Sequence, residues 1–204
     1  MITLESLAYA LFGNNLVIGS HIRRQLAFLR EIVPPGLLHR RMDDLGCGDG
    51  KVTVLLEEIF RPEATRGFDI NHGLVRRANG RGIRAGVMDL NKAMPKGELA
   101  VMWGVLHHLK DYDDCLQRLK ENYPLVVIRE PVRTGLMKGL ELGHPLRPAD
   151  LIRLFNRHFP DAGIHYCDNS VLLFYACPGH VIERKLISPE IEMPAAPALR
   201  AATG

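Results

Sequence analysis

One glycine-rich segment constrains the fold of this chain more than any other part of its sequence. Residues 42–45 are a strand candidate and residues 51–60 a helix candidate, and the link between them reads Gly46-Cys47-Gly48-Asp49-Gly50. Glycines at alternate positions permit a tight turn whose backbone amides stay open to a ligand, and the following helix adds its positive N-terminal end. A strand that enters a helix through such a turn is typical of α/β folds that bind a nucleotide-like cofactor.

Strand and helix candidates alternate along the rest of the chain. Further strands are expected at residues 65–69, 83–88, 99–103 and 125–130, and further helices at residues 72–79, 112–121 and 148–158. The last two strand candidates, 163–168 and 171–177, must pair antiparallel, because the link between them is too short for a crossover helix. We therefore predict an α/β fold, a three-layer sandwich with a mostly parallel seven-stranded sheet and a C-terminal antiparallel hairpin strand.

The segments before and after this alternation differ from it in composition. Within residues 16–33, apolar side chains recur at helical spacing at Ile22, Leu26, Leu29 and Ile32. We expect residues 1–40 to form an N-terminal helical cap, residues 41–180 the cofactor-binding α/β domain, and residues 181–204 an extension. Residues 188–204 are rich in Pro and Ala without periodicity, so this extension is expected to be largely a flexible tail.

The charge and cysteine content disfavour several classes of protein. The formal net charge is +3, and the arginines are scattered rather than gathered in one basic run, which argues against a nucleic-acid partner. The four cysteines show no Cys-x-x-Cys spacing, which argues against structural zinc and for a reducing compartment. The first residues lack the basic start of a secretory signal, and no apolar run approaches the roughly 20 residues of a membrane span. We expect a cytoplasmic protein with no metal site and no membrane partner.

Acidic side chains around the glycine turn indicate which cofactor it holds. Asp43, Asp44 and Asp49 flank the turn, and Lys51 stands where the dinucleotide-binding pattern Gly-x-Gly-x-x-Gly has its last glycine or alanine. Carboxylates repel a pyrophosphate wherever water does not screen them well. S-adenosylmethionine has no phosphate and carries two cationic groups, a sulfonium and an ammonium. The turn therefore favours S-adenosylmethionine over NAD or FAD.

Two acids at the ends of later strand candidates are predicted to complete the cofactor site. Asp69 ends the second strand candidate, where its carboxylate can accept both hydroxyls of a ribose. Asp89 follows the third strand candidate and is placed to accept the exocyclic amine of adenine. The neighbouring Ile70 and Leu90 would form apolar walls for the ring. Either acid could instead be the N-cap of a helix, an alternative that the sequence leaves open.

Residues 42–177 resemble a class I S-adenosylmethionine-dependent methyltransferase of the small-molecule type. The glycine turn, Asp69 and Asp89 match the family's cofactor motifs, and Leu106-His107-His108-Leu109 matches its strand-four segment. Residues 120–124 depart from many relatives, because Lys-Glu-Asn-Tyr-Pro replaces a Lys-Pro-Gly-Gly type turn. The resemblance implies S-adenosylmethionine as the cofactor, with its methionine end near the backbone of residues 103 and 104. The expected cofactor-binding residues are Asp44, Gly46, Cys47, Gly48, Asp69, Ile70, Asp89, Leu90 and Trp103; Cys47 is expected as a small turn residue and not as a nucleophile.

The acceptor side of the site is expected after the fourth and fifth strand candidates. No Asn-Pro-Pro-Tyr, Asp-Pro-Pro-Tyr or Pro-Cys follows the fourth strand, so methylation of nucleic-acid bases has no supporting motif. The candidate catalytic or substrate-contacting residues are His107, His108, Glu130 and His144, each with a structural role as the alternative. A general base is needed only if the acceptor must lose a proton. Residues 131–147 mix apolar and cationic side chains, so they form either a lid over an apolar acceptor with an anionic group or an ordinary connector.

The leading hypothesis is methyl transfer from S-adenosylmethionine to an oxygen, nitrogen or carbon atom of a small molecule. A non-catalytic S-adenosylmethionine-binding partner or sensor protein is the second hypothesis. An RNA methyltransferase, supported only by the arginine content, is the third. A nicotinamide oxidoreductase comes last because of Lys51 and the acidic turn. The acceptor molecule and the oligomeric state stay open.

Overall fold

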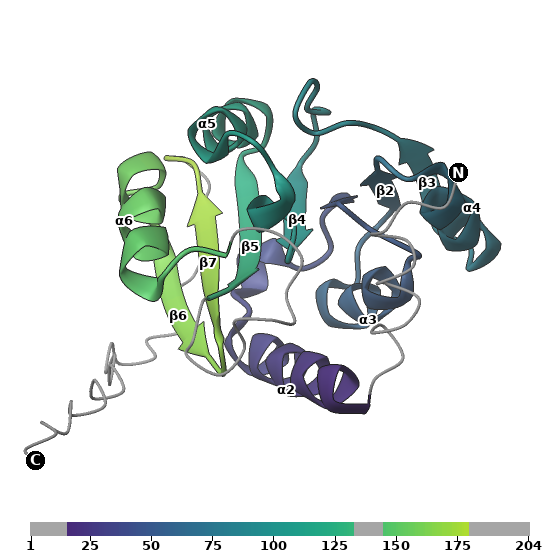
Figure 1. Cartoon of the computed structure of the whole chain (residues 1–204), viewed down its shortest axis with the longest axis horizontal. Coiled ribbons are helices and arrows are strands. Elements are labelled where there is room, and N and C mark those ends of the chain that lie inside the picture. Colours follow the sequence, from purple (N-terminus) through teal and green to yellow (C-terminus); the bar gives the residue numbers. More distant parts are fainter. Residues whose placement is uncertain (1–15, 133–144, 180–204) are drawn as a thin grey trace, which may run out of the picture.

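Seven strands form one sheet in the order β3-β2-β1-β4-β5-β7-β6 (Figure 1). Their bounds are Met42–Leu45 (β1), Thr65–Asp69 (β2), Arg84–Val87 (β3), Leu99–Trp103 (β4), Leu125–Pro131 (β5), Gly163–Cys167 (β6) and Ser170–Ala176 (β7). Strands β1 to β5 are parallel, whereas β7 runs antiparallel to β5 and to β6. The computed structural model, which describes residues 16–132 and 145–179, thus confirms the expected mostly parallel sheet with a C-terminal hairpin.

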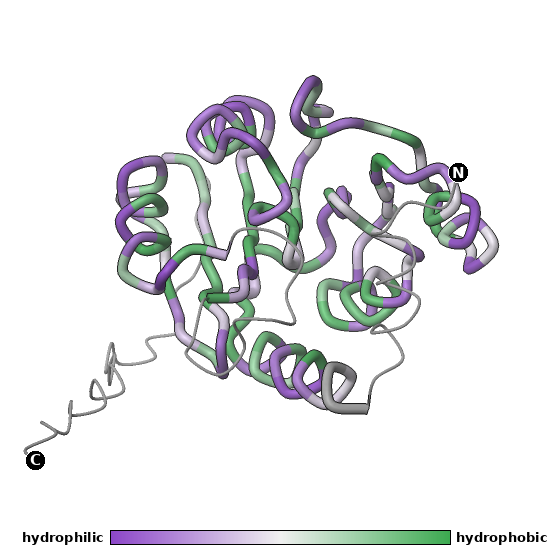
Figure 2. The backbone as a smooth tube through the Cα atoms, viewed as in Figure 1, coloured by the Kyte–Doolittle hydropathy of each residue, from purple (hydrophilic) through white to green (hydrophobic). Residues whose placement is uncertain are grey.

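Helices cover both faces of this sheet (Figure 1). One face carries α2 (Leu16–Ile32), α3 (Lys51–Phe60) and α4 (His72–Gly80), and the other carries α5 (Tyr112–Asn122) and α6 (Pro148–His158). Figure 2 shows apolar stretches along the central strands and hydrophilic turns on the outer sides of α5 and α6. The three-layer sandwich expected from the sequence is confirmed.

Alternate residues of the central strands pack into opposite layers. Met102 and Ile128 belong to the core beneath α5 and α6, whereas Val101 and Val127 belong to the core beneath α2 and α3. Successive side chains of a strand point to opposite faces, and all four of these residues are fully buried. This double burial explains why β4 and β5 appear in the sequence as continuous apolar runs.

The strand order reverses between β1 and β4, and this reversal locates the site. Strand β1 pairs with β2 on one side and with β4 on the other. In open α/β sheets, ligands bind in the crevice outside the carboxyl ends of the strands at such a switch point. The glycine turn leaves β1 there, and the loop of residues 104–109 leaves β4 there.

Most elements lie within one residue of their expected ends. Strand β3 is shorter than the expected 83–88, because Ile83 belongs to the turn after α4, where its N–H donates to the carbonyl of Ala78 at 3.1 Å. Strand β6 ends at Cys167 because Asp168 adopts a left-handed φ of 51° in the hairpin turn. These strand ends are set by the geometry of the turns, which the periodicity of apolar residues does not reveal.

Some expectations concern residues that the structure does not describe. Of residues 1–40, expected as an N-terminal helical cap, the structure describes α2 and a short 3-10 helix at Pro35–Leu37. Residues 1–15, the expected tail at 188–204 and most of the segment 131–147 lie outside the described ranges. Within those ranges no helix is long and apolar enough to cross a membrane. The described part of the chain also contains no group of His, Cys, Asp or Glu suited to hold a metal ion, and all four cysteines are free.

Candidate active site

The glycine turn is pressed against the loop that follows β4. Gly46 and Cys47 donate their N–H groups to the carbonyl of Phe68 on β2, at 2.7 and 3.0 Å. Gly46 has a φ of 88°, which residues with a side chain rarely adopt. A Cβ atom on Gly46 would overlap both methyl groups of Val105. Only glycine therefore fits at this point of contact between the turn and the loop.

Asp44 lies beneath the turn as a buried carboxyl group. It is 2% exposed, and the hydroxyl of Thr53 on α3 donates to Oδ2 of Asp44 at 2.5 Å. Burial raises the pKa of Asp44 to about 7, and the carboxylates of Asp69 and Glu57 add to this, despite the hydrogen bond from Thr53. A cation bound at the turn would favour the ionised form of Asp44, so this group suits a positively charged ligand.

The other two acids near the turn are paired with arginines. Asp43 accepts hydrogen bonds from Nε and Nη2 of Arg66 at 2.7 and 2.5 Å. Asp49 is paired with Nη2 of Arg81 at 3.2 Å. These cations offset the two charges, so the expectation that three carboxylates together repel a pyrophosphate needs correction. The electrostatic preference for a cationic ligand depends mainly on Asp44.

Asp44→Asn is expected to raise the free energy of unfolding at neutral and alkaline pH. Because the folded-state pKa lies above the ordinary value of 3.8, the folded protein keeps a proton that the unfolded chain has released, and stability falls as pH rises from about 4 to about 7. Asparagine cannot ionise and can still accept from Thr53, so the variant avoids this loss of roughly 4 kcal/mol at about pH 8. Urea unfolding near pH 4 and near pH 8 measures the difference in the free energy of unfolding between the variant and the wild-type protein.

The same variant is expected to bind S-adenosylmethionine more weakly, because the cation then lacks the buried negative charge. The affinity of the wild-type protein should rise with pH through about 7, whereas the affinity of Asp44→Asn should change little over that range. Equal pH slopes for the two proteins, or equal stability at both pH values, would contradict the role given to Asp44.

Asp69 ends β2 with its carboxylate against the glycine turn. Its Oδ2 accepts the N–H of Gly48 at 2.9 Å, and its Oδ1 accepts the N–H of Asn71 at 2.8 Å. Asn71 is the N-cap of α4, since its side chain accepts the N–H groups of the first helical turn, and this rules out the N-cap alternative for Asp69. A carboxylate has about four lone-pair sites, so these two bonds do not by themselves fill it. The ribose contact stays a prediction.

The residues expected around adenine differ in their surroundings. Ile70 is 59% exposed next to the end of β2, as a wall for a flat ring would be. Leu90 is buried in the core on the α5 side. Asp89 accepts the backbone N–H and the side-chain amide of Asn91 at 3.0 and 3.1 Å, and these bonds hold the pKa of Asp89 below its ordinary value. Asp89 therefore shapes its own turn, and its contact with adenine stays a prediction.

Cys47 and Trp103 both pack into the protein. The thiol of Cys47 lies in a small cluster with Ala78 and Ile83, and burial raises the pKa of this thiol, which does not suit a nucleophile. Trp103 packs against the core on the α2 side. The guanidinium carbon of Arg129 lies 5.8 Å from the centre of the Trp103 ring. A cofactor would therefore contact Cys47 and Trp103 mainly through their backbone atoms.

Glu130 holds the loop that follows β4. It is 2% exposed, and its Oε1 accepts the N–H groups of Val105 and Leu106 at 2.7 and 2.6 Å. Its Oε2 lies 2.8 Å from Nδ1 of His107. A carboxylate only accepts hydrogen bonds, so Nδ1 carries the hydrogen, and in the neutral ring the lone pair is on Nε2. Glu130 thus fixes both the backbone of the loop and the orientation of the His107 ring.

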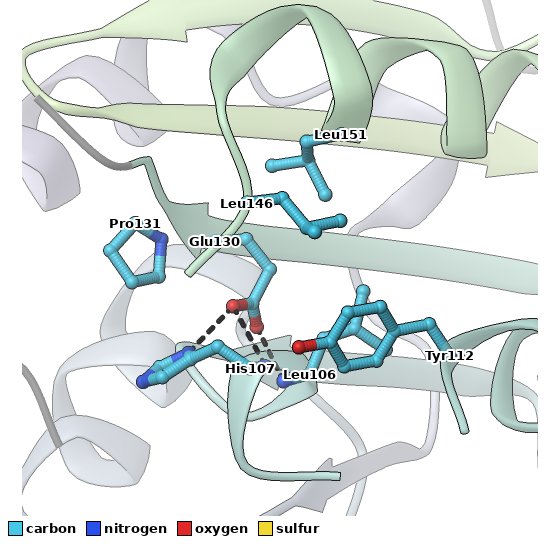
Figure 3. A pocket seen from close by; sticks show the side chains of 7 residues that line it. All are labelled: Leu106, His107, Tyr112, Glu130, Pro131, Leu146 and Leu151. Carbon is cyan, nitrogen blue, oxygen red and sulfur yellow. Dashed lines mark hydrogen bonds and ion pairs between the residues drawn. The ribbon is translucent and has the colours of Figure 1, made fainter. Parts of the chain in front are cut away.

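A small pocket adjoins this pair (Figure 3). It has a volume of about 10 Å³ and is lined by Leu106, His107, Tyr112, Glu130, Pro131, Leu146 and Leu151. Most of the lining is apolar, and a carboxylate, an imidazole and a phenol hydroxyl supply the polar groups (Figure 3). The lining, with apolar walls and a few oriented polar groups, is of the kind found in small-molecule sites, whereas the volume has room for only about one water molecule.

The four candidate catalytic residues differ in their positions in the structure. His107 and Glu130 are in contact, as described above. His108 is exposed, and its ring lies against that of His107, with 4.0 Å between the ring centres and 41° between the ring planes. His144 lies outside the described residues.

Several residues of the site carry no signal in the sequence. Val105, Leu146 and Leu151 are ordinary apolar residues that reach the site through tertiary packing. Arg129 is the one cation of β5 and stands next to Glu130. Thr53 could have been suspected, because a hydroxyl in the first turn of a helix after a buried acid can reach that acid.

Comparisons with known proteins agree with this geometry. A family model described as "Methyltransferase domain" matches residues 20–162. An S-adenosylmethionine-dependent methyltransferase from Mesorhizobium loti is 16% identical, with a TM-score of 0.57 over 74% of this chain and 96% of that one. The magnesium protoporphyrin IX methyltransferase of Synechocystis PCC 6803, solved with bound SAH, is 15% identical, with a TM-score of 0.57 over 87% and 89% of the two chains. The mitomycin 7-O-methyltransferase is 14% identical, with a TM-score of 0.60 over 85% and 57%. A search of curated proteins finds no matching sequence.

The family match extends from α2 through α6 and includes the glycine turn, Asp69 and the loop after β4. The solved structures share the fold of this chain. The chain therefore belongs to the methyltransferase-domain family, as a class I S-adenosylmethionine-dependent methyltransferase.

Proposed function

We propose that the protein methylates a small molecule bound at the carboxyl ends of β4 and β5, with His107 as the general base. The observation that carries this proposal is the Glu130–His107 pair, 2.8 Å apart at the edge of an apolar pocket. The same loop touches the glycine turn through Val105 and Gly46. The acceptor and the methyl donor would therefore meet across this loop.

The residues at the turn fit S-adenosylmethionine. Asp44 is a buried carboxyl whose ionisation a bound cation would favour, and the turn has left-handed glycines where the ligand must approach the backbone closely. Asp69 is the residue proposed for the ribose hydroxyls. When bound, the cofactor supplies an electrophilic methyl group on a positively charged sulfur.

His107 would accept the proton that the acceptor loses as its oxygen or nitrogen atom takes the methyl group. In the neutral ring of His107 the lone pair is on Nε2, because Glu130 accepts the hydrogen on Nδ1. The carboxylate of Glu130 would stabilise the imidazolium that forms, as an acid does in other acid–histidine pairs. Leu106 and Leu151 would keep water away from the reacting atoms.

A small-molecule acceptor is favoured over RNA by the charges of the described residues. Many arginines are committed to ion pairs with acids and do not form an open basic face. These arginines are Arg24, Arg30, Arg40, Arg41, Arg66, Arg81, Arg118, Arg147, Arg153 and Arg157. Two of the structural neighbours are named for small-molecule acceptors, protoporphyrin and mitomycin.

The direct test uses S-adenosylmethionine with a labelled methyl group. The protein is incubated with a metabolite extract, with total RNA and with a protein extract, and the label is followed in each. Label in the metabolite fraction supports the proposal. Label confined to RNA or protein, or the absence of calorimetric binding at millimolar cofactor, refutes it.

Asp69→Ala is expected to weaken binding of S-adenosylmethionine by about 2 kcal/mol, because a charge-assisted bond to the ribose is lost. Asp114→Ala, which removes an exposed acid of α5 paired with Arg118, is the matched control and should leave the affinity unchanged. A cofactor analogue without ribose hydroxyls separates this contact from a distorted turn. The wild-type protein should bind the analogue more weakly than the cofactor, and Asp69→Ala should bind the two alike. If the variant still distinguishes them, Asp69 does not contact the ribose.

A further inference from the structure

We propose that Arg129 binds the carboxylate of the cofactor's methionine half and so selects S-adenosylmethionine over adenosyl sulfonium compounds that lack this group. The inference depends on the cofactor site proposed above. It assigns a recognition role to a strand residue that lies outside the glycine turn and outside the acceptor pocket.

The guanidinium of Arg129 lies at the end of β4. Arg129 of β5 is in register with Trp103, the last residue of β4, and the N–H of Gly104 donates to the carbonyl of Arg129 at 2.7 Å. Nη1 of Arg129 is 3.0 Å from the point where a Cβ atom of Gly104 would lie. The cation therefore occupies space that the missing side chain of Gly104 leaves open.

The order of the strands directs the methionine half of the cofactor toward this cation. Asp69 ends β2, the glycine turn follows β1, and Gly104 follows β4, and these three strands are adjacent in the sheet in that order. Neighbouring strands are about 4.8 Å apart, so the ends of β2 and β4 are roughly 10 Å apart. A ligand with its ribose at Asp69 and its sulfur above the turn has its amino-acid end over β4.

The charges at this edge complement an amino-acid zwitterion. The ammonium and the sulfonium are attracted by Asp44 beneath the turn, and the carboxylate needs a cation on the β4 side. Arg129 supplies the positive charge that the carboxylate requires.

Arginine suits this task better than lysine would. Its planar guanidinium can form two parallel hydrogen bonds to one carboxylate. The ring of Trp103, 5.8 Å from the guanidinium carbon, restricts the orientation of that plane, so less freedom is lost when the ligand binds.

The test compares two cofactors that differ in one group, S-adenosylmethionine and decarboxylated S-adenosylmethionine, by calorimetry on the full chain. Arg129→Met should weaken binding of S-adenosylmethionine on the order of 30-fold and leave binding of the decarboxylated compound nearly unchanged. Arg129→Lys should lie between the wild-type protein and Arg129→Met. Arg153→Met, which removes an exposed arginine of α6 paired with Asp150, should change neither affinity.

The outcomes separate this inference from the proposed function. If the wild-type protein binds neither compound, the cofactor site itself is wrong. If the wild-type protein binds both and Arg129→Met weakens both equally, or neither, Arg129 does not bind the carboxylate. Urea unfolding of Arg129→Met and Arg129→Lys checks that each variant folds, and the lysine variant keeps the comparison open should the methionine variant prove unstable.

Discussion

Gly46→Ala is expected to abolish binding of S-adenosylmethionine and to lower the free energy of unfolding by about 3 kcal/mol. Two costs add at this position. The backbone has a φ of 88°, which costs a residue with a side chain roughly 1–2 kcal/mol. The new methyl group also overlaps both methyl groups of Val105, and overpacking typically costs about 1–3 kcal/mol. Urea unfolding and calorimetry measure the two effects.

Two other glycines provide matched controls for Gly46→Ala. Gly82 has a φ of 89°, but a Cβ atom added there would meet no other atom within 4 Å, so Gly82→Ala carries the backbone cost alone, about 1 kcal/mol. Gly80 is in α4 with open space around it, so Gly80→Ala should be neutral or slightly stabilising. The double variant Gly46→Ala/Val105→Ala should recover part of the stability. A Gly46→Ala protein as stable as Gly82→Ala would show that the turn and the loop are not in contact.

Glu130→Ala is expected to lower the free energy of unfolding by roughly 3–4 kcal/mol and to eliminate methyl transfer. The variant leaves the N–H groups of Val105 and Leu106 buried without their acceptor, and each such loss costs about 1–3 kcal/mol. It also frees the ring of His107, whose Nδ1 lies 2.8 Å from Glu130. The variant no longer has to bury the carboxylate of Glu130, which is favourable, but this gain offsets only part of the cost.

Glu130→Gln distinguishes the structural role of this residue from its effect on His107. The amide oxygen of glutamine can still accept hydrogen bonds from the loop, so Glu130→Gln should lower the free energy of unfolding only about half as much as Glu130→Ala. Its NH2 group cannot accept from Nδ1, so His107 should move its hydrogen to Nε2 and lose the basic lone pair. Nitrogen NMR of the His107 ring reports this change without any acceptor. Glu121→Ala, an exposed acid of α5, is the control. A His107 tautomer that is the same in Glu130→Gln as in the wild-type protein would contradict the positioning role.

Local sequence was sufficient for the fold, because its main determinants are local. The glycine turn is set by three glycines between a strand and a helix, and the alternation of apolar runs with helical segments determines the parallel sheet. Doubly buried strands such as β4 are recognisable as uninterrupted apolar residues. The ends of β3 and β6 were less accurate, since Ile83 and Asp168 are placed by turns.

The charges and ion pairs of the site were harder to predict, because they depend on residues that are far apart in the sequence. The acids near the turn looked equivalent in sequence, but Asp43 is paired with Arg66 and Asp49 with Arg81. Only the fold shows that all three acids are buried and that Asp44 alone among them has no cation in the ion pairs described. Glu130 was expected to face the acceptor, and its bonds to the loop could not be inferred from a residue 25 positions after Val105.

The contact between Val105 and Gly46 also sets a rule for redesigning the acceptor preference of this protein. Leu146 and Leu151 line the pocket from the α6 side and do not touch the glycine turn in the contacts described. Variants at these two positions would therefore leave the proposed cofactor site unchanged. Val105 offers no such freedom, because its side chain fills the hollow above Gly46. A larger residue there would reshape both halves of the site at once, so a library that mutates position 105 would lose cofactor occupancy before it gained a new acceptor.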